Sequence, residues 1–210
     1  MTRLATSERT ALCDTALAVG PDEPTLSGEW TVKDLVVHLL LREGSPAAVG
    51  IVVAALSPLA DAVSARIGRR SFPELVERLR SGPPRLSPLA IPQLDELANT
   101  LEFFVHHEDI RRAQPGWSPR DLAAATERTL WSSVGTPGKA LTRKAPVGVR
   151  IRNSTTGESK VLRKGAQTVT VQGPPAEVVL YLFGRSAQAR VELLGDPDAV
   201  ARLQATSLSM

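Results

Sequence analysis

Apolar residues recur at helical spacing through about the first two thirds of the chain, and glycine or proline separates the successive stretches. Two starts carry capping chemistry: Thr31 with Asp34, and Ser71 with Glu74. Ser118 before Pro119 resembles a third start. The pattern predicts helices over residues 7–19, 31–44, 71–81, 93–113 and 118–134, and one broken helix over 46–56 and 59–67.

The pattern changes after Pro146, where apolar and polar residues alternate as they do in strands. Alternation predicts strands over 147–152, 159–163, 168–172 and 189–193, and helical spacing predicts helices over 175–183 and 197–205. Just before this change, the segment Gly135–Gly138 predicts a break, followed by a short helical turn over 139–144. We therefore expect an α+β fold, with a helical domain over residues 1–144 and a small α/β domain over residues 145–210.

Composition narrows the class of protein. A chain of 210 residues can bury a real core in one domain or two small ones. The net charge of +3 is spread along the chain without a basic tract, so no nucleic-acid partner is expected. The single cysteine, Cys13, excludes an intramolecular disulfide. The chain does not open on a signal sequence, and its longest apolar stretch, around 49–59, is too short to span a bilayer. We expect a soluble cytoplasmic protein without a membrane partner.

The candidate chemistry lies with the histidines. Glu102 and His106 are four residues apart, so both project from one helical face, and His38 lies on another, largely apolar helix. Two imidazoles and a carboxylate that meet from two helices would form a three-ligand metal site with an open position. Taken singly, each has a plainer interpretation: a solvated Glu–His pair for Glu102 and His106, and a core histidine bonded to a backbone carbonyl for His38.

Neighbouring residues leave alternatives open. His107 points about 100° away from His106, and it either supports the site or is simply packed. Asp109 either orients the His106 imidazole, as metal-bound histidines usually require, or pairs with Arg111 or Arg112. Cys13 is a weak candidate for a thiolate ligand, and a small buried core residue is the preferred interpretation.

Two further expectations concern aromatic and charged residues near the helix ends. Trp30 is expected to anchor the start of its helix in the core. Four charged residues either line a pocket for an anionic substrate or, as the preferred interpretation, include some that lie on the surface: Arg42, Glu43, Arg111 and Arg112.

Three segments carry a family resemblance. Residues 28–39, from Gly28 to Leu39, resemble the second-helix signature of the DinB-like metal-binding superfamily. Residues 102–109 resemble the Glu-x-x-x-His segment of its mycothiol-dependent maleylpyruvate isomerase branch. Residues 169–177 and 195–197 resemble the small C-terminal domain of that branch, which is related to sterol carrier proteins. The resemblance covers essentially the whole chain and is nearest to an actinobacterial group described as metal-binding.

The resemblance implies a DinB-like four-helix bundle followed by a sterol-carrier-like domain, with a divalent metal, typically Zn²⁺, held by His38, Glu102 and His106. It also implies mycothiol as a cofactor in isomerase or S-transferase chemistry on a small molecule. A metal-bound thiolate could add to an activated alkene or displace a leaving group, and metal-bound water could hydrolyse an amide. The alternative is a non-enzymatic binding or regulatory module with a structural or vestigial metal site. The chain is expected to act as a monomer or homodimer.

Overall fold

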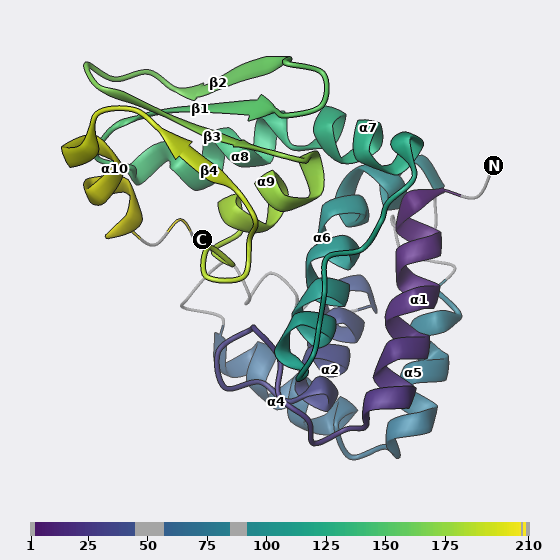
Figure 1. Ribbon diagram of the computed structural model, residues 1–210. Coiled ribbons are helices and arrows are strands. Elements are labelled where there is room, and N and C mark those ends of the chain that lie inside the picture. Colours follow the sequence, from purple (N-terminus) through teal and green to yellow (C-terminus); the bar gives the residue numbers. More distant parts are fainter. Residues whose placement is uncertain (1–2, 45–56, 85–91, 207, 209–210) are drawn as a thin grey trace. The chain divides into compact units, whose positions relative to one another are not determined.

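The computed structural model describes residues 3–44, 57–84, 92–206 and 208. The described residues combine helices with a four-stranded sheet, as the predicted α+β class requires (Figure 1). They form two compact units, residues 1–119 and 120–210. The predicted boundary between residues 144 and 145 separates two domains that would fold independently. Compact units do not test independent folding, so this boundary stays a prediction.

The first unit is helical over its described residues. Its helices are α1 (Leu4–Val19), α2 (Val32–Gly44), α4 (Ser57–Ile67), α5 (Phe72–Arg80) and α6 (Pro92–Ala113). Helix α1 packs against α5 and α6, while α2 packs against α4 and α5 (Figure 1). Leu12, Leu35, Leu75 and Phe103 are fully buried at these contacts, because each lies on the apolar stripe of its helix.

Local chemistry explains where two of these helices begin. The backbone N–H of Asp34 donates to Thr31 Oγ1 at 3.2 Å, and the backbone N–H of Thr31 donates to Asp34 Oδ2 at 3.0 Å. Ser71 and Glu74 form the same reciprocal arrangement at α5. Both satisfy backbone donors that a helix start leaves unpaired, so these predicted caps are confirmed. The predicted helical segment over 46–56 lies outside the described residues.

The second unit contains α7 (Ala124–Ser133), α8 (Gly135–Leu141), a 3₁₀ turn η4 (Thr142–Lys144), α9 (Pro175–Leu182) and α10 (Pro197–Gln204). Its strands are β1 (Gly148–Asn153), β2 (Ser159–Arg163), β3 (Thr168–Gly173) and β4 (Glu192–Leu194). The sheet order is β2-β1-β3-β4, with β1 parallel to β3 and antiparallel pairing at both edges. Alternate residues of the central strands, including Val149, Ile151, Val169 and Val171, are fully buried, and α9 packs against these strands.

Three predicted elements differ from the structure. The helix expected to start at Ser118 begins only at Ala124. The preceding segment is held by side chains of α6 instead: Arg111 donates to the Ser118 carbonyl at 3.3 Å, and the Arg112 guanidinium stacks on Trp117. Proline at position 119 also disfavours helical geometry at Ser118.

The predicted break lies just before Gly135–Gly138 and not within it: α7 ends at Ser133, Val134 separates the two helices, and residues 135–138 form the first turn of α8. Pro137 is tolerated there, since the N–H groups of a first turn have no partner within the helix. Gly138 also allows close packing, because a Cβ at this position would lie 2.9 Å from a methyl carbon of Leu162. The strand expected over 189–193 is shorter and shifted to β4, because the Glu177 carboxylate binds the Arg190 N–H at 2.7 Å before pairing begins.

Candidate metal centre

Helices α2 and α6 bring the three predicted ligands together. Glu102 Oε1 lies 3.6 Å from His38 Nε2 and 3.3 Å from His106 Nε2. The three ligand atoms all lie within 4.8 Å of one another. Their side chains are 12–20% exposed, so the cluster is partly buried but remains accessible to a small ligand.

These distances suit a metal ion. Zinc bonds of 2.0–2.1 Å to nitrogen and 2.0–2.2 Å to oxygen place neighbouring ligands of a tetrahedral site about 3.3 Å apart. Both measured separations from Glu102 lie close to that value. The residue types also fit, since imidazole nitrogen and carboxylate oxygen are both ordinary zinc ligands.

The orientation of His106 is fixed by residues outside the triad. Its Nδ1 lies 2.9 Å from Asp109 Oδ2, and the same carboxylate oxygen accepts a 2.8 Å hydrogen bond from Ser27 Oγ. Asp109 is fully buried. A carboxylate on Nδ1 leaves Nε2 as the free ligand atom, which is the arrangement that metal-bound histidines typically show. Of the two interpretations of Asp109, the structure therefore contains the contact to His106.

Opposite charges on the carboxylates and the His106 imidazole stabilise the cluster. Burial alone would raise the pKa of Glu102, but hydrogen bonds with His106 and His38 hold it well below its usual range, so the carboxylate is ionised. Burial alone would lower the pKa of His106, but the Asp109 and Glu102 carboxylates raise it to about 9. The cluster therefore carries a proton on His106 at neutral pH unless a cation replaces it.

A second set of polar residues supports Glu102 from the side of the core. Arg42 Nε lies 3.3 Å from Glu102 Oε1, and its guanidinium also donates to Asn99 Oδ1. Asn99 in turn donates to Glu43 Oε1 at 2.9 Å, and Glu43 pairs with Arg9 at 2.5 Å. Glu43 and Asn99 are buried, so this line of contacts runs from the metal cluster into the core.

Of the four charged residues near the helix ends, two are buried and two are partly exposed. Glu43 is buried in the network just described, and Arg112 is buried against Glu108 with a 2.5 Å contact. Arg111 is only partly exposed and also binds Glu108. Of the four, Arg42 lies at the cluster itself, where it contacts Glu102.

Trp30 does not anchor its helix in the core, contrary to expectation. Its side chain is 39% exposed, and its ring centroid lies 4.8 Å from that of His38. Both rings line a cavity of about 780 Å³ between α2 and α4, together with Val37, Leu41 and Ser64. Capping by Thr31 and Asp34 already secures the helix start, which leaves Trp30 beside the cluster.

Two other candidates lie away from the cluster. His107 is buried between α1 and α6, where Nδ1 contacts Glu8 at 2.9 Å and Nε2 contacts Thr15 at 3.0 Å, so it is a packed residue. Cys13 is fully buried in the core of the first unit, and burial raises the pKa of its thiol to about 12. Such a thiol is protonated at neutral pH, and the preferred interpretation of Cys13 is confirmed.

Sequence reasoning missed Ser27 and Asn99. Asn99 lies three residues before Glu102 on the same helix, so helical spacing could have placed it beside the carboxylate. Ser27 lies in the loop before α2, and no local pattern links it to Asp109, 82 residues later.

Comparisons with known proteins now bear on this geometry. No protein-family model matches the chain, and no curated protein matches its sequence. A solved structure, "Crystal structure of the mycothiol-dependent maleylpyruvate isomerase", superposes with a TM-score of 0.54 at 19% identity, over 90% of each chain. The chain shares the fold of that isomerase. At this identity the likeness shows the fold alone.

Within the described residues, no helix is both long and apolar enough to cross a membrane.

Proposed function

We propose that this chain binds one divalent metal ion, Zn²⁺ in the first instance, through His38, Glu102 and His106. We further propose that it is a thiol-dependent isomerase or S-transferase acting on a small molecule, with mycothiol as the thiol. The convergence of three ligand atoms within 4.8 Å carries the proposal. The proposed setting is cytoplasmic, as a monomer or homodimer whose partners are small molecules.

The surroundings of the cluster support an open, reactive site. Asp109 aims His106 Nε2 at the ligand position, and the Glu102 carboxylate is held ionised by His106 and His38, with Arg42 adding to the effect. When bound, a divalent metal would lower the pKa of a thiol or water at its open position and so supply a nucleophile at neutral pH.

The cavity beside His38 provides room for such a ligand. Its volume of about 780 Å³ lies within the range of small-molecule sites. Trp30 forms an apolar wall, whereas Lys33, Asp34 and Asp61 add charge at the rim. The fold shared with a mycothiol-dependent isomerase makes mycothiol the thiol to test first.

One observation favours a second candidate, a non-enzymatic module with a structural or vestigial site. Arg42 already contacts Glu102 at 3.3 Å, so the carboxylate has a counter-charge without a metal. Glu102→Ala separates the two functions. An enzyme should lose metal and activity while staying folded, whereas a structural site should lose stability together with metal.

The direct test is metal content per chain by elemental analysis, on protein purified without a histidine tag and reloaded with Zn²⁺. We expect about one ion per wild-type chain and none in His106→Ala. The matched control is His107→Gln, because the adjacent histidine belongs to a different contact set with Glu8 and Thr15. Circular dichroism checks that each variant is folded. Equal metal content in His106→Ala and wild type would overturn the ligand assignment.

Thiol dependence requires its own measurement. Cobalt(II) replaces zinc in such sites and gives a visible spectrum that reports its ligands. We expect mycothiol to add a sulfur-to-cobalt charge-transfer band to the cobalt-loaded protein, and the alcohol analogue of mycothiol to leave the spectrum unchanged. A spectrum that does not respond to mycothiol would reject the thiol mechanism while leaving metal binding intact.

A further inference from the structure

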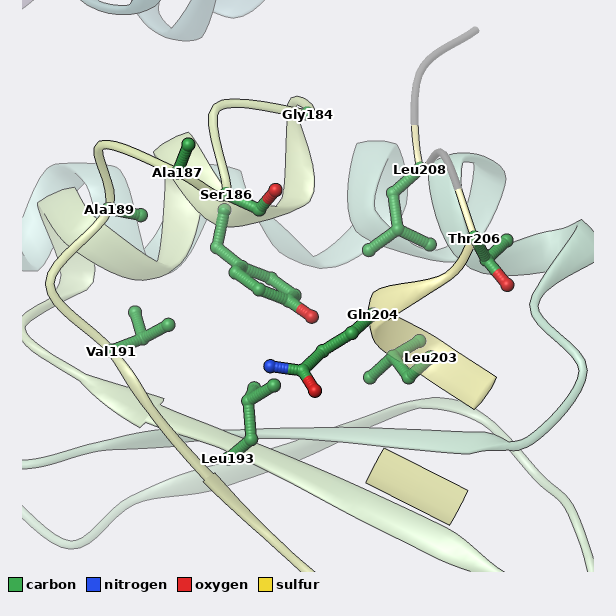
Figure 2. A pocket seen from close by; sticks show the side chains of 11 residues that line it. Gly184, Ser186, Ala187, Ala189, Val191, Leu193, Leu203, Gln204, Thr206 and Leu208 are labelled. Carbon is green, nitrogen blue, oxygen red and sulfur yellow. The ribbon is translucent and has the colours of Figure 1, made fainter. Parts of the chain in front are cut away.

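A second cavity, of about 590 Å³, lies wholly within the second unit. Side chains from the end of α9, the loop that follows it, β4 and α10 surround the cavity (Figure 2). Its volume falls within the range of small-molecule sites. It shares no residue with the metal cluster or with the cavity beside His38.

The described residues that line this cavity include no charged side chain. Val191, Leu193, Leu203 and Leu208 form an apolar wall, and Figure 2 shows them around the cavity. A charged ligand would meet no counter-charge from these side chains, whereas an uncharged ligand needs none. The lining therefore selects against ions and in favour of uncharged molecules.

Four of the lining side chains are polar, namely Tyr181, Ser186, Gln204 and Thr206, and two of them, Tyr181 and Gln204, bear on the choice of ligand. Tyr181 is only 4% exposed, yet its hydroxyl has no hydrogen-bond partner among the described residues. Gln204 is an exposed residue at the end of α10, and its side chain extends into the cavity with the amide toward Leu193 (Figure 2). The Tyr181 hydroxyl is therefore open to the cavity, where a bound ligand can take the place of water as its hydrogen-bond partner.

The chemistry of the ligand follows from these two groups. Burial raises the pKa of Tyr181, so its hydroxyl keeps its proton and can donate. The Gln204 amide can both donate and accept. A carbonyl or carboxamide oxygen next to an apolar ring or chain would satisfy both groups and fill the remaining volume.

We propose that this cavity binds a small, uncharged molecule with an apolar body and a carbonyl or carboxamide group, which Tyr181 and Gln204 hydrogen-bond. The site is separate from the proposed metal centre and does not depend on it.

The proposal can be tested on the full metal-free chain with two probes of matched shape, 2-naphthamide and 2-naphthoate. Saturation-transfer NMR detects binding, and titration of protein amide shifts gives the dissociation constant. We expect the amide to bind with a dissociation constant below about 1 mM and the carboxylate to bind at least about tenfold more weakly. Equal affinity for the two probes, or no binding of the amide up to its solubility limit, would overturn the proposal.

Variants locate the binding. Ala189→Trp should fill the cavity and abolish binding, whereas Ala201→Trp, on an exposed position of α10 outside the lining, should leave it unchanged. Tyr181→Phe removes only the hydroxyl and should weaken binding of the amide about threefold to tenfold. Chemical shifts of the second unit verify folding of each variant. Full binding by Ala189→Trp would place the probe elsewhere, and full affinity of Tyr181→Phe would remove the assigned hydrogen bond.

Discussion

Metal binding by this chain should strengthen as the pH rises from 7 to 9, because His106 must lose a proton before its Nε2 can bind a metal. Contacts with Asp109 and Glu102 outweigh the lowering effect of burial and raise the pKa of His106 to about 9 in the metal-free chain. At pH 7 the protonated form therefore exceeds the neutral form by about 100 to 1, so the apparent affinity lies about 100-fold, or about 2.7 kcal/mol, below its alkaline plateau. Glu102 adds no slope in this range, because its pKa lies well below the usual value.

The assay is a competition titration against a chromophoric chelator with known proton equilibria, at pH 7, 8 and 9. We expect about a ninefold gain from pH 7 to 8, about a five- to sixfold gain from pH 8 to 9 as the pH reaches the pKa of His106, and release of about one proton per metal ion at pH 7, measured by calorimetry in buffers of different ionisation enthalpy. His107→Gln should show the same slope, since its ring lies outside the cluster. An affinity that changes less than about threefold between pH 7 and 9, without proton release, would refute the assigned protonation of His106.

The same shift has a consequence for the metal-free fold, with a definite sign. The folded pKa of His106 lies above its ordinary value near 6.5, so its contacts contribute stability that is fully present below about pH 6.5. That contribution is lost as the pH rises through about 9. Metal loading should therefore stabilise the protein most at alkaline pH, where the proton no longer competes.

Three other predictions concern single residues. Asp109→Asn should weaken zinc binding at pH 9 by about 10- to 100-fold and move the pH profile of His106 to lower values, and an unchanged profile would remove Asp109 from the site. Cys13, with a pKa raised to about 12 by burial, should react with a disulfide reagent at neutral pH only when the protein is unfolded in urea, and prompt reaction of the native protein would contradict its burial. Gly148→Ala should destabilise the fold by about 1–3 kcal/mol in urea titrations, because its Cβ would lie 2.9 Å from a backbone nitrogen in the turn before β3. Gly135→Ala, with open space around its Cβ, is the control and should remain within about 0.5 kcal/mol of wild type.

The sequence predicted the features that depend on spacing between neighbours in the chain. It predicted less accurately the features that contacts between distant residues determine. The Glu102–His106 pair follows from one turn of helix, and the strands from alternation, so both could be predicted from neighbours in the chain. The helix start at residue 118 could not, because contacts from Arg111 and Arg112 hold that segment outside a helix. Trp30 was misplaced for a different reason: its ring lies beside His38, eight residues along the helix that it precedes, and not in the core.

The residue types raised the convergence of His38 with the other two ligands as a possibility, and the resemblance strengthened it. Spacing could not predict it, because 64 residues separate His38 from Glu102 and no periodicity relates two helices so far apart. The supporting residues were the hardest to predict. The contact of Ser27 with Asp109 spans 82 positions and involves a loop serine, a residue type common in loops for local reasons.

The line of contacts from Arg9 through Glu43, Asn99 and Arg42 to Glu102 gives the candidate centre a property of its own. Each charge in it already has a partner without a metal, so the three ligands are held near their binding positions before any ion arrives. Preorganisation of this kind favours binding, because the chain does not have to order the ligands at the same time. Arg42 acts in the opposite direction, since a cation beside Glu102 repels an incoming metal at short range. Two effects therefore set the metal affinity of this centre. The preorganised ligands strengthen metal binding, and the Arg42 guanidinium and the His106 proton weaken it.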